Sequence, residues 1–532
     1  MIERNLNTMI WMVGLFLVVG CSAGTKAVRK DRELLEENSS KQQSIGLKNG
    51  DLSQLQKKLG RPKNSPKEIF YAATSETCCG EDPHAVHGIE TPDGGFVLTG
   101  KSLDRNGEWQ GFAVKFPANI PSGSHWLDPE EKVSYEWSYV FGSDDAKDGG
   151  NAVAATEESV FVGGFNTDSK NRLQRFLAKL DLKSGDLIWK TNLPTRNSKG
   201  ESAFESLYLT KDGGLVGSGF VQGEEEGVEG FKSYGNPQSG KAFLLHLSAS
   251  QVTGNTPPQT PQWEQVYPDV LSGKTVKEIQ GLEPGYVVAT STRDERHIPV
   301  VMRVDIKGNL LWSNKYPGHG ELTDITVLSK EGKPDGFAMS GHRKDSEGGI
   351  DGVMTKISPK GAILWSYHYG NPEGGIGMFR GLGSVKRKLI YDECWGIDGT
   401  PDGGAVMACG TGIEECEPFE ADEALYDECT VDPRRTWRSL VIRVDAQGSP
   451  KWHRLDSYQR LEAGEEEEEE NAIATASEYV FVTRGGRIAS ITDLSIGIGL
   501  QLFESELASR NWDRWFSTIK TNTNSISSNN LK

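Results

Sequence analysis

The chain repeats one pattern about seven times, and this repetition constrains its fold more than any other feature. Each copy holds short runs of β-branched and aromatic residues separated by glycine-containing turns, and clear copies read VFVGGF…FLAKLDLKSGDLIWKTNL, YVVATS…VVMRVDIKGNLLWSNKYPG and GFAMSG…GVMTKISPKGAILWSYHYG. A period of roughly 50 residues with several short strands per copy is typical of a β-propeller blade. We therefore expect an all-β protein, a seven-bladed β-propeller of four-stranded antiparallel blades.

Each repeat resolves into four strands, named here a to d from the inside outward. Strand a leads into strand b through an Asp-Gly turn, as at 92–95, 211–214 and 401–404. Asp-Gly supplies the positive φ angles that a tight hairpin turn requires, so a and b should pair antiparallel. Residues 67–73 resemble a d strand, and the last repeat supplies only three strands. We expect the N-terminal strand to complete the last blade, which would close the ring and protect its edge.

One tryptophan stands at the equivalent place in strand d of six repeats: Trp137, Trp189, Trp263, Trp312, Trp365 and Trp452. Such a row can stack on sugars or contact a cofactor, but one tryptophan per blade is more typical of packing between blades. The segment Asp-x-x-(Ser)-Gly-x-x-x-Trp, at 181–189, 305–312 and 445–452, resembles the tryptophan docking motif of PQQ-like, quinoprotein-type propellers. The resemblance implies the architecture and not catalysis, because many members of that superfamily are binding or assembly lipoproteins without a cofactor.

The N-terminus indicates the compartment. A short apolar stretch after Arg4, MIWMVGLFLVVG, is too brief for a comfortable membrane span and has the size of a secretory signal. It ends in Val18-Val19-Gly20-Cys21, which resembles a bacterial lipobox and implies that Cys21 is diacylated and becomes the new N-terminus. Ser22 in place of Asp implies, by the same resemblance, an outer-membrane destination in the cell envelope. An ordinary signal peptide or an uncleaved anchor is the alternative.

These signals divide the chain into four parts: a lipoprotein signal peptide at 1–20, a flexible polar tether at 21–65, the propeller at 66–502 and a C-terminal tail at 503–532 with one short helix. The acidic excess, 75 Asp and Glu against 58 Lys and Arg, repels phosphate backbones and anionic lipid headgroups. We therefore expect no nucleic acid among the partners.

Most long insertions fall in the b-to-c loops and d-to-a connectors, which emerge on the same face of a propeller. They span 221–241, 371–390 and 411–437. Variable loops on a rigid scaffold are the usual arrangement of a binding surface, and tolerated insertions are the alternative. We expect this loop-rich face to bind a protein or a glycan at the cell envelope.

The sixth repeat carries four cysteines. Cys394 and Cys409 flank its Asp-Gly turn and should lie opposite each other on paired strands, while Cys416 and Cys429 bracket an acidic loop. In an oxidising envelope we favour the disulfides 394–409 and 416–429, one of three possible pairings. A zinc site is disfavoured because no paired C-x-x-C occurs in this repeat.

The acidic loop offers carboxylates for a basic partner, for calcium or simply for solvent. No D-x-D-x-D-G spacing points to calcium. The residues expected to contribute to binding are Glu415, Glu417, Glu420, Asp422, Asp427 and Trp395.

Cys78 and Cys79 are adjacent and precede His84 and His87, which permits a vicinal disulfide, a metal site or two bonds to elsewhere. Quinoprotein dehydrogenases carry a vicinal disulfide against PQQ with a tryptophan opposite, and Trp395 should begin an inner strand. A quinoprotein-like oxidoreductase, or another propeller enzyme working at the mouth of the central channel, is therefore the competing interpretation.

Other enzymatic signatures are missing from the sequence. There is no G-x-S-x-G, no H-E-x-x-H and no phosphate loop, and neither a calcium site nor a catalytic carboxylate set of the quinoprotein kind can be located. The sequence favours a non-catalytic binding or scaffold module, with no catalytic residues, no metal and no cofactor.

Overall fold

The computed structural model describes residues 66–75, 78–130, 132–142, 147–169, 172–193, 200–223, 240–281, 283–294, 296–330, 333–344, 350–370, 390–413, 438–456, 458–459, 472–473, 475–494 and 497–504. In these residues the chain is almost entirely strand, with one short helix, α4 (Ala249–Thr253). None of the described helices is long and apolar enough to cross a membrane. The all-β prediction is confirmed.

The strands pair antiparallel in groups of four, which we call the first to the seventh blade in chain order of their inner strands. The first three are β2 (Glu81–Glu90), β3 (Phe96–Leu103), β4 (Trp109–Phe116) and β6 (Trp137–Phe141); β7 (Gly149–Ala155), β8 (Ser159–Thr167), β9 (Leu173–Asp181) and β10 (Leu187–Asn192); and β11 (Glu201–Leu209), β12 (Leu215–Gly223), β13 (Lys241–Leu247) and β14 (Trp263–Tyr267).

The fourth to sixth groups follow the same plan. They are β15 (Thr275–Ile279), β16 (Gly285–Ser291), β17 (Pro299–Asp305) and β18 (Leu310–Lys315); β19 (Glu321–Lys330), β20 (Lys333–Lys344), β21 (Ile350–Ile357) and β22 (Ile363–Tyr369); and β23 (Ile390–Gly399), β24 (Ala405–Ile413), β25 (Arg438–Val444) and β26 (Pro450–Asp456). A parallel bridge between Ile350 and Tyr391 links the fifth group to the sixth. A separate two-stranded ribbon consists of β27 (Tyr458–Gln459) and β28 (Ala472–Ile473).

The seventh group joins the two ends of the described chain. It consists of β29 (Thr475–Val482), β30 (Ile488–Leu494), β31 (Gly497–Phe503) and β1 (Glu68–Ser75), and β1 pairs antiparallel with β31, as the sequence predicted. A feature that the sequence did not reveal is β5 (Gly123–Trp126), which pairs parallel with β1 on its outer side. β1, which closes the ring, is therefore paired on both of its edges.

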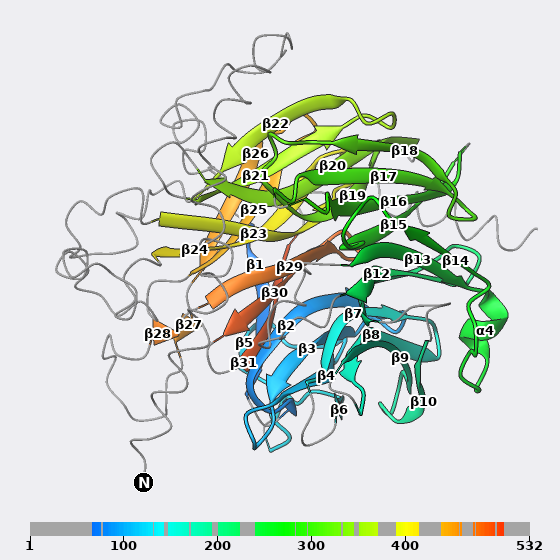
Figure 1. Ribbon diagram of the computed structural model, residues 1–532. Helices are drawn as coiled ribbons and strands as arrows, with labels where there is room; N and C mark the ends of the chain where they lie inside the picture. The colour runs from blue at the N-terminus through cyan, green and yellow to red at the C-terminus, as the bar shows by residue number, and fades with distance from the viewer. Residues whose placement is uncertain are drawn as a thin grey trace, which may run out of the picture.

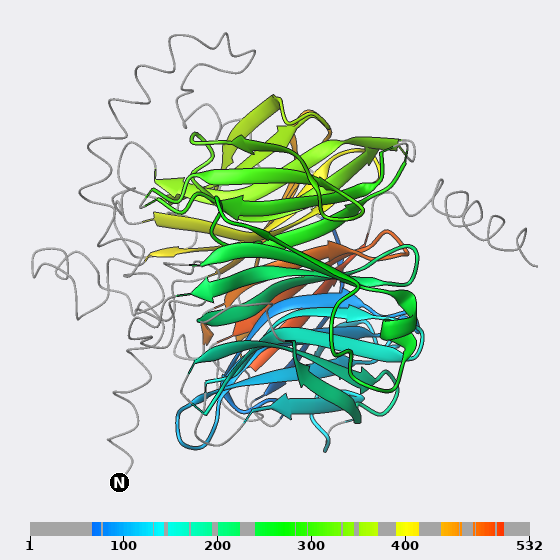
Figure 2. The same ribbon diagram turned by 45° about the vertical axis from the view of Figure 1, so that its right-hand side comes forward.

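The inner strands form a closed circuit. β2, β7, β11, β15, β19, β23 and β29 each contact the next, and β29 contacts β2. Figures 1 and 2 show the blades arranged around this ring, with α4 on the edge opposite the labelled ends of β23 and β24. The propeller architecture is confirmed, and the count of seven blades stays a prediction with which these groups agree.

The tryptophans of strands d lie against the turn between strands c and d of the following blade. Trp137 Nε1 donates to Leu182 O at 3.0 Å, and a Cβ added at Gly185 would lie 2.6 Å from the Trp137 ring. The same ring-to-glycine contact joins Trp263 to Gly308, Trp312 to Gly361 and Trp365 to Gly448; Trp189 Nε1 donates to Gly254 O at 3.3 Å, and Trp452 lies 5.8 Å from the Phe503 ring. These contacts hold neighbouring blades together.

Candidate functional site at the ring axis

The inner strands are bulged at one equivalent position. Register shifts leave one residue unpaired at this position in six of them, and in the fourth blade Lys274 N donates to the carbonyl of Ala289, which already pairs with Thr275. The extra residues, called here the bulge ring, are Val86, Asn151, Glu205, Lys274, Thr323, Trp395 and Glu478. A bulge re-aims the side chain of its extra residue.

The bulge ring faces the axis. All of its members except Asn151 are half-buried, although the residues on either side of them in their strands are buried apart from His87. Contacts between blades agree with this orientation, because Asn151 Nδ2 lies 3.4 Å from Glu205 Oε2 and Lys274 Nζ lies 3.2 Å from Glu321 Oε1. The ring axis is therefore lined by side chains that sequence periodicity alone would assign to the faces between blades.

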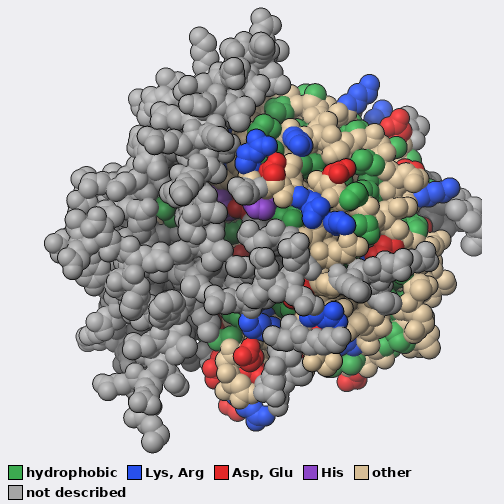
Figure 3. All heavy atoms as spheres, in the orientation of Figure 1, with side chains coloured by type: hydrophobic (Ala, Val, Ile, Leu, Met, Phe, Trp, Pro, Cys, Tyr) green, Lys and Arg blue, Asp and Glu red, His purple; other side chains and the backbone are tan. Residues whose placement is uncertain are grey.

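Charged side chains gather around the bulge ring in the first half of the inner strands. We call this set the axial cluster: Asp82, His84, Lys101, Glu205, Lys274, Glu321, His342, Glu393, Glu478 and Asp493. His84 Nδ1 lies 2.5 Å from Asp493 Oδ2, which joins the first blade to the seventh, and His342 Nε2 lies 3.4 Å from Glu321 Oε2. Figure 3 shows histidine and acidic side chains together near the middle of the described surface.

Burial and mutual repulsion shift the titration of the axial cluster. Burial raises the pKa of Glu205 to about 8 against the opposing charges of Lys274 and Lys101. Burial and the neighbouring Asp493 raise the pKa of Glu478 to about 8, and burial raises that of Glu393 to about 7. Six carboxyl groups share the cluster with two lysines and two histidines, and the raised pKa values mean that Glu205 and Glu478 are largely protonated at neutral pH. Perturbed groups of this kind are typical of functional sites.

His84 titrates in the opposite sense. Burial lowers its pKa, but the charge and hydrogen bond of Asp493 outweigh burial and raise the pKa to about 10. The imidazolium is therefore part of the cluster at neutral pH, at the seam where the first and last blades meet.

The second half of the axis is filled by side chains that reach across it. Lys277 Nζ of the fourth blade lies 3.2 Å from Tyr479 Oη of the seventh, and the His87 ring lies 4.3 Å from the Tyr479 ring. Asp324 accepts from the backbone of Ile325 and Ile397 at 2.7 and 3.0 Å. Burial lowers the pKa of Lys277, but Tyr479, Asp324 and Asp398 outweigh burial and raise it. We call this group the axial plug.

The cysteines of the sixth blade behave as expected where the structure describes them. Cys394 and Cys409 pair in register on β23 and β24 and form a disulfide. Trp395 lies within β23 and not at its start, where the sequence placed it, and it belongs to the bulge ring. The other predicted residues lie outside the described part of the chain: Cys21, Glu415, Cys416, Glu417, Glu420, Asp422, Asp427 and Cys429.

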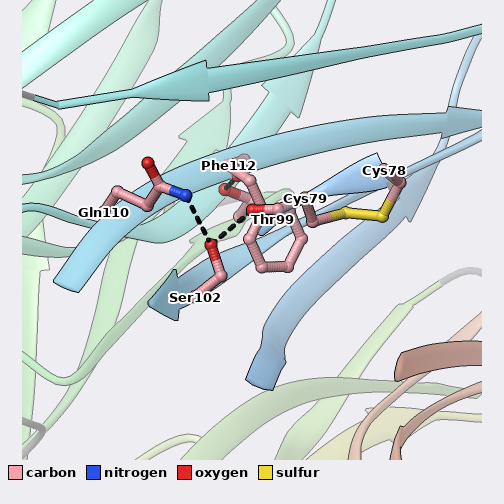
Figure 4. Close-up of a disulfide and its surroundings, with 6 residues drawn as sticks. All are labelled: Cys78, Cys79, Thr99, Ser102, Gln110 and Phe112. Carbon is pink, nitrogen blue, oxygen red and sulfur yellow. Dashed lines mark hydrogen bonds between the residues drawn. A yellow bond between two sulfur atoms is a disulfide. The ribbon is translucent and has the colours of Figure 1, made fainter. Parts of the chain in front are cut away.

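Cys78 and Cys79 form a vicinal disulfide that is buried in the apolar core between the first and seventh blades, in one cluster with Phe96 and Phe112. Ser102 Oγ donates to the carbonyl of Cys79, and Gln110 Nε2 donates to Ser102 Oγ at 3.3 Å (Figure 4). Trp395, which the resemblance placed opposite this disulfide, lies on β23 of the sixth blade. No group of three potential metal ligands occurs among the described residues.

Apart from His84, the charged members of the axial cluster were missed by the sequence analysis. A signal does exist. Val86, Glu205 and Trp395 each stand seven residues before the aspartate of their Asp-Gly turn. Counting back from each turn would have aligned them.

The comparisons with known proteins concern the fold alone. No family model and no curated protein matches the sequence. Similar solved structures include the Neurospora crassa Pan2 WD40 domain (9% identity, 83% of this chain and 96% of that chain, TM-score 0.45) and BBS1N in complex with ARL6DN (9%, 83% and 97%, TM-score 0.41). A quinohemoprotein alcohol dehydrogenase from Pseudomonas putida HK5 is also similar (10%, 80% and 66%, TM-score 0.37). At these identities no residue role is transferred.

Proposed function

We propose that the chain is a non-catalytic binding module of the cell envelope that receives a protein partner over the loop-rich face. The axial cluster carries this proposal. It occupies the first half of the inner strands, toward the face on which the connectors enter, and the axial plug crosses the second half. A ligand would therefore approach from the loop-rich face and stop at the plug.

The charge of the axial cluster favours a cationic guest. Six carboxyl groups face two lysines and two histidines, and Glu205 Oε1 is buried without a hydrogen-bond partner among the described residues. A lysine or arginine side chain of a partner protein would donate hydrogen bonds to these carboxyl groups and favour their ionised form, because hydrogen bonds between ionised groups are strong. A neutral glycan brings no such charge, so a basic protein surface fits better.

Membrane attachment is part of the same proposal. The lipobox-like Val18 to Cys21 supports a diacylated Cys21, and Ser22 supports the outer membrane. The native mass spectrum of protein purified from its own host, without chelator or reductant, tests this. Cleavage and acylation at Cys21 would support anchoring, whereas an intact signal would contradict it, and the extra mass of a metal or quinone would favour the oxidoreductase.

The binding proposal is tested by cross-linking in the native envelope through a photoreactive residue placed at Thr323. We expect a cross-linked protein that disappears in the variant with Glu205→Gln and Glu478→Gln. The matched control carries Glu130→Gln and Glu157→Gln, two exposed positions on turns of the opposite face. Equal loss in both variants, or a cross-link that survives the axial substitutions, would contradict the proposal.

An acid–base enzyme is the second candidate, because pKa values of about 8 for Glu205 and Glu478 and about 7 for Glu393 suit proton transfer near neutral pH. The same variants separate the two functions. A binding module loses its partner with Glu205→Gln, whereas an enzyme keeps its substrate and loses turnover.

A further inference from the structure

Exposed aliphatic side chains are concentrated on two neighbouring blades. Eight large hydrophobic residues are exposed among those the structure describes, and five of these belong to the fourth and fifth blades. We call these five the aliphatic rim: Ile306, Leu310, Leu311, Ile363 and Leu364, each 49–55% exposed. The other three, Val140, Leu187 and Val266, stand singly on the first, second and third blades.

The aliphatic rim is one surface and not two. Its members lie on the outer strands β18 and β22 and on the turn before β18, and these strands run side by side in Figures 1 and 2. The turn that precedes β22 packs on the end of β18, because Tyr316 Oη donates to Gly361 O at 2.8 Å and a Cβ at Gly361 would lie 3.1 Å from the Trp312 ring. Contiguous apolar surface of this kind usually marks an interaction site.

The charges around the aliphatic rim are basic, in contrast to the rest of the chain. The chain has a net charge of −17, but residues 306–320 and 358–369 contain no Asp or Glu. Lys307, Lys315 and Lys360 are exposed among the aliphatic side chains. Asp305, which directly precedes the first of these segments in the sequence, accepts from the backbone of its own turn, from Lys307 N at 2.8 Å and Asn309 N at 2.8 Å. Figure 3 shows hydrophobic side chains over these blades, with basic and acidic side chains among them.

The chemistry of the rim distinguishes a lipid surface from a protein partner. Protein interfaces are enriched in aromatic residues and arginine and depleted in lysine. Surfaces that lie in a lipid headgroup layer combine aliphatic side chains with lysines, whose long stems reach back to the phosphates. The aliphatic rim has the composition of a surface that lies in a lipid headgroup layer.

We infer that the aliphatic rim contacts an anionic membrane surface. Leu310, Leu311, Ile363 and Leu364 enter the headgroup layer, and the lysines pair with lipid phosphates. This contact needs no lipid on Cys21 and no ligand at the axis. Because β18 and β22 lie on the circumference of the ring, the propeller would rest on its side and leave the loop-rich face open to a partner.

Vesicle co-sedimentation of the chain from Ser22 to Lys532 tests this inference. Every described strand lies after Ser22, so this chain keeps every described blade. We expect it to sediment with vesicles of equal phosphatidylglycerol and phosphatidylethanolamine, and much less with phosphatidylcholine alone. Leu311→Glu with Leu364→Glu should lower the partition on the order of tenfold. Lys307→Gln, Lys315→Gln and Lys360→Gln should each lower it about fivefold.

Leu187→Glu is the control, because Leu187 opens the outer strand of the second blade as Leu310 and Ile363 open β18 and β22, and it is 41% exposed with no other exposed large hydrophobic residue on its described strand. It should leave vesicle binding unchanged, and circular dichroism and thermal unfolding should be the same in all variants. Three results would overturn the inference. They are no binding of the unsubstituted chain, equal loss with Leu187→Glu, or a solution dimer that Leu311→Glu with Leu364→Glu dissociates.

Discussion

The two halves of the ring axis are lined by side chains of the same inner strands, but these side chains have opposite effects on stability. In the axial plug, Lys277 reaches Tyr479 across the ring, and Asp324 accepts two backbone N–H groups. In the axial cluster, three glutamates have raised pKa values, and Glu205 Oε1 is buried with no hydrogen-bond partner in the described part of the chain. The plug stabilises the ring, whereas the cluster costs stability, as functional sites often do.

The largest effect is expected from the plug. Lys277→Met removes the cation that faces Asp324 and Asp398, and leaving such carboxylates uncompensated costs about 4 kcal/mol of unfolding free energy. Urea unfolding at neutral pH measures this change. If the variant is as stable as the unsubstituted protein, the plug does not hold the ring together, and the comparison between the halves fails.

The next largest loss of stability is expected from removing the disulfide beside Trp395. Cys394 immediately precedes Trp395, and the disulfide to Cys409 closes a loop with a sequence separation of 15, which is worth about 3 kcal/mol. Cys394→Ser with Cys409→Ser should lower the unfolding free energy by that amount. Cys78→Ser with Cys79→Ser opens a bond that encloses no loop and should cost less. The reverse order in urea unfolding would show that the sixth-blade disulfide does not brace the axis.

The axial cluster predicts a distinct pH dependence. The folded state raises the pKa of Glu205 and Glu478 from the ordinary 4.5 to about 8, so it binds protons that the unfolded state has released. Stability should therefore fall as the pH rises from about 4.5 to about 8. Glu205→Gln with Glu478→Gln should flatten this decline and stabilise the protein by about 1–2 kcal/mol above pH 8. Thermal unfolding across this range checks it, and an unchanged slope would contradict it.

The repeat made the architecture predictable from the sequence, because turns and tryptophans are local signals. The pairing of β1 with β31 and of Cys394 with Cys409 followed from counting strands. The positions of the axial side chains could not be predicted in this way, because each bulge shifts the alternation of inward and outward side chains in its strand by one residue. Glu205 and Glu478 also come from different blades, and nothing local in the sequence relates them. β5 escaped notice because its pairing with β1 is parallel and arises inside an insertion.

Two lysines three residues apart on the fourth blade give the sharpest version of the comparison. Lys274 belongs to the bulge ring, and its Nζ lies 3.2 Å from Glu321 Oε1, whose side chain is 37% exposed. Partly exposed pairs of this kind contribute below about 1 kcal/mol, so Lys274→Met should hardly change the urea midpoint, in contrast to Lys277→Met. The same variant should shift the pH dependence, because Lys274 opposes the rise of the Glu205 pKa and its loss lets that pKa rise further. The decline of stability should then extend to higher pH. If Lys274→Met instead costs as much as Lys277→Met and leaves the pH dependence unchanged, both halves of the axis are structural, and the axial cluster is not a binding site.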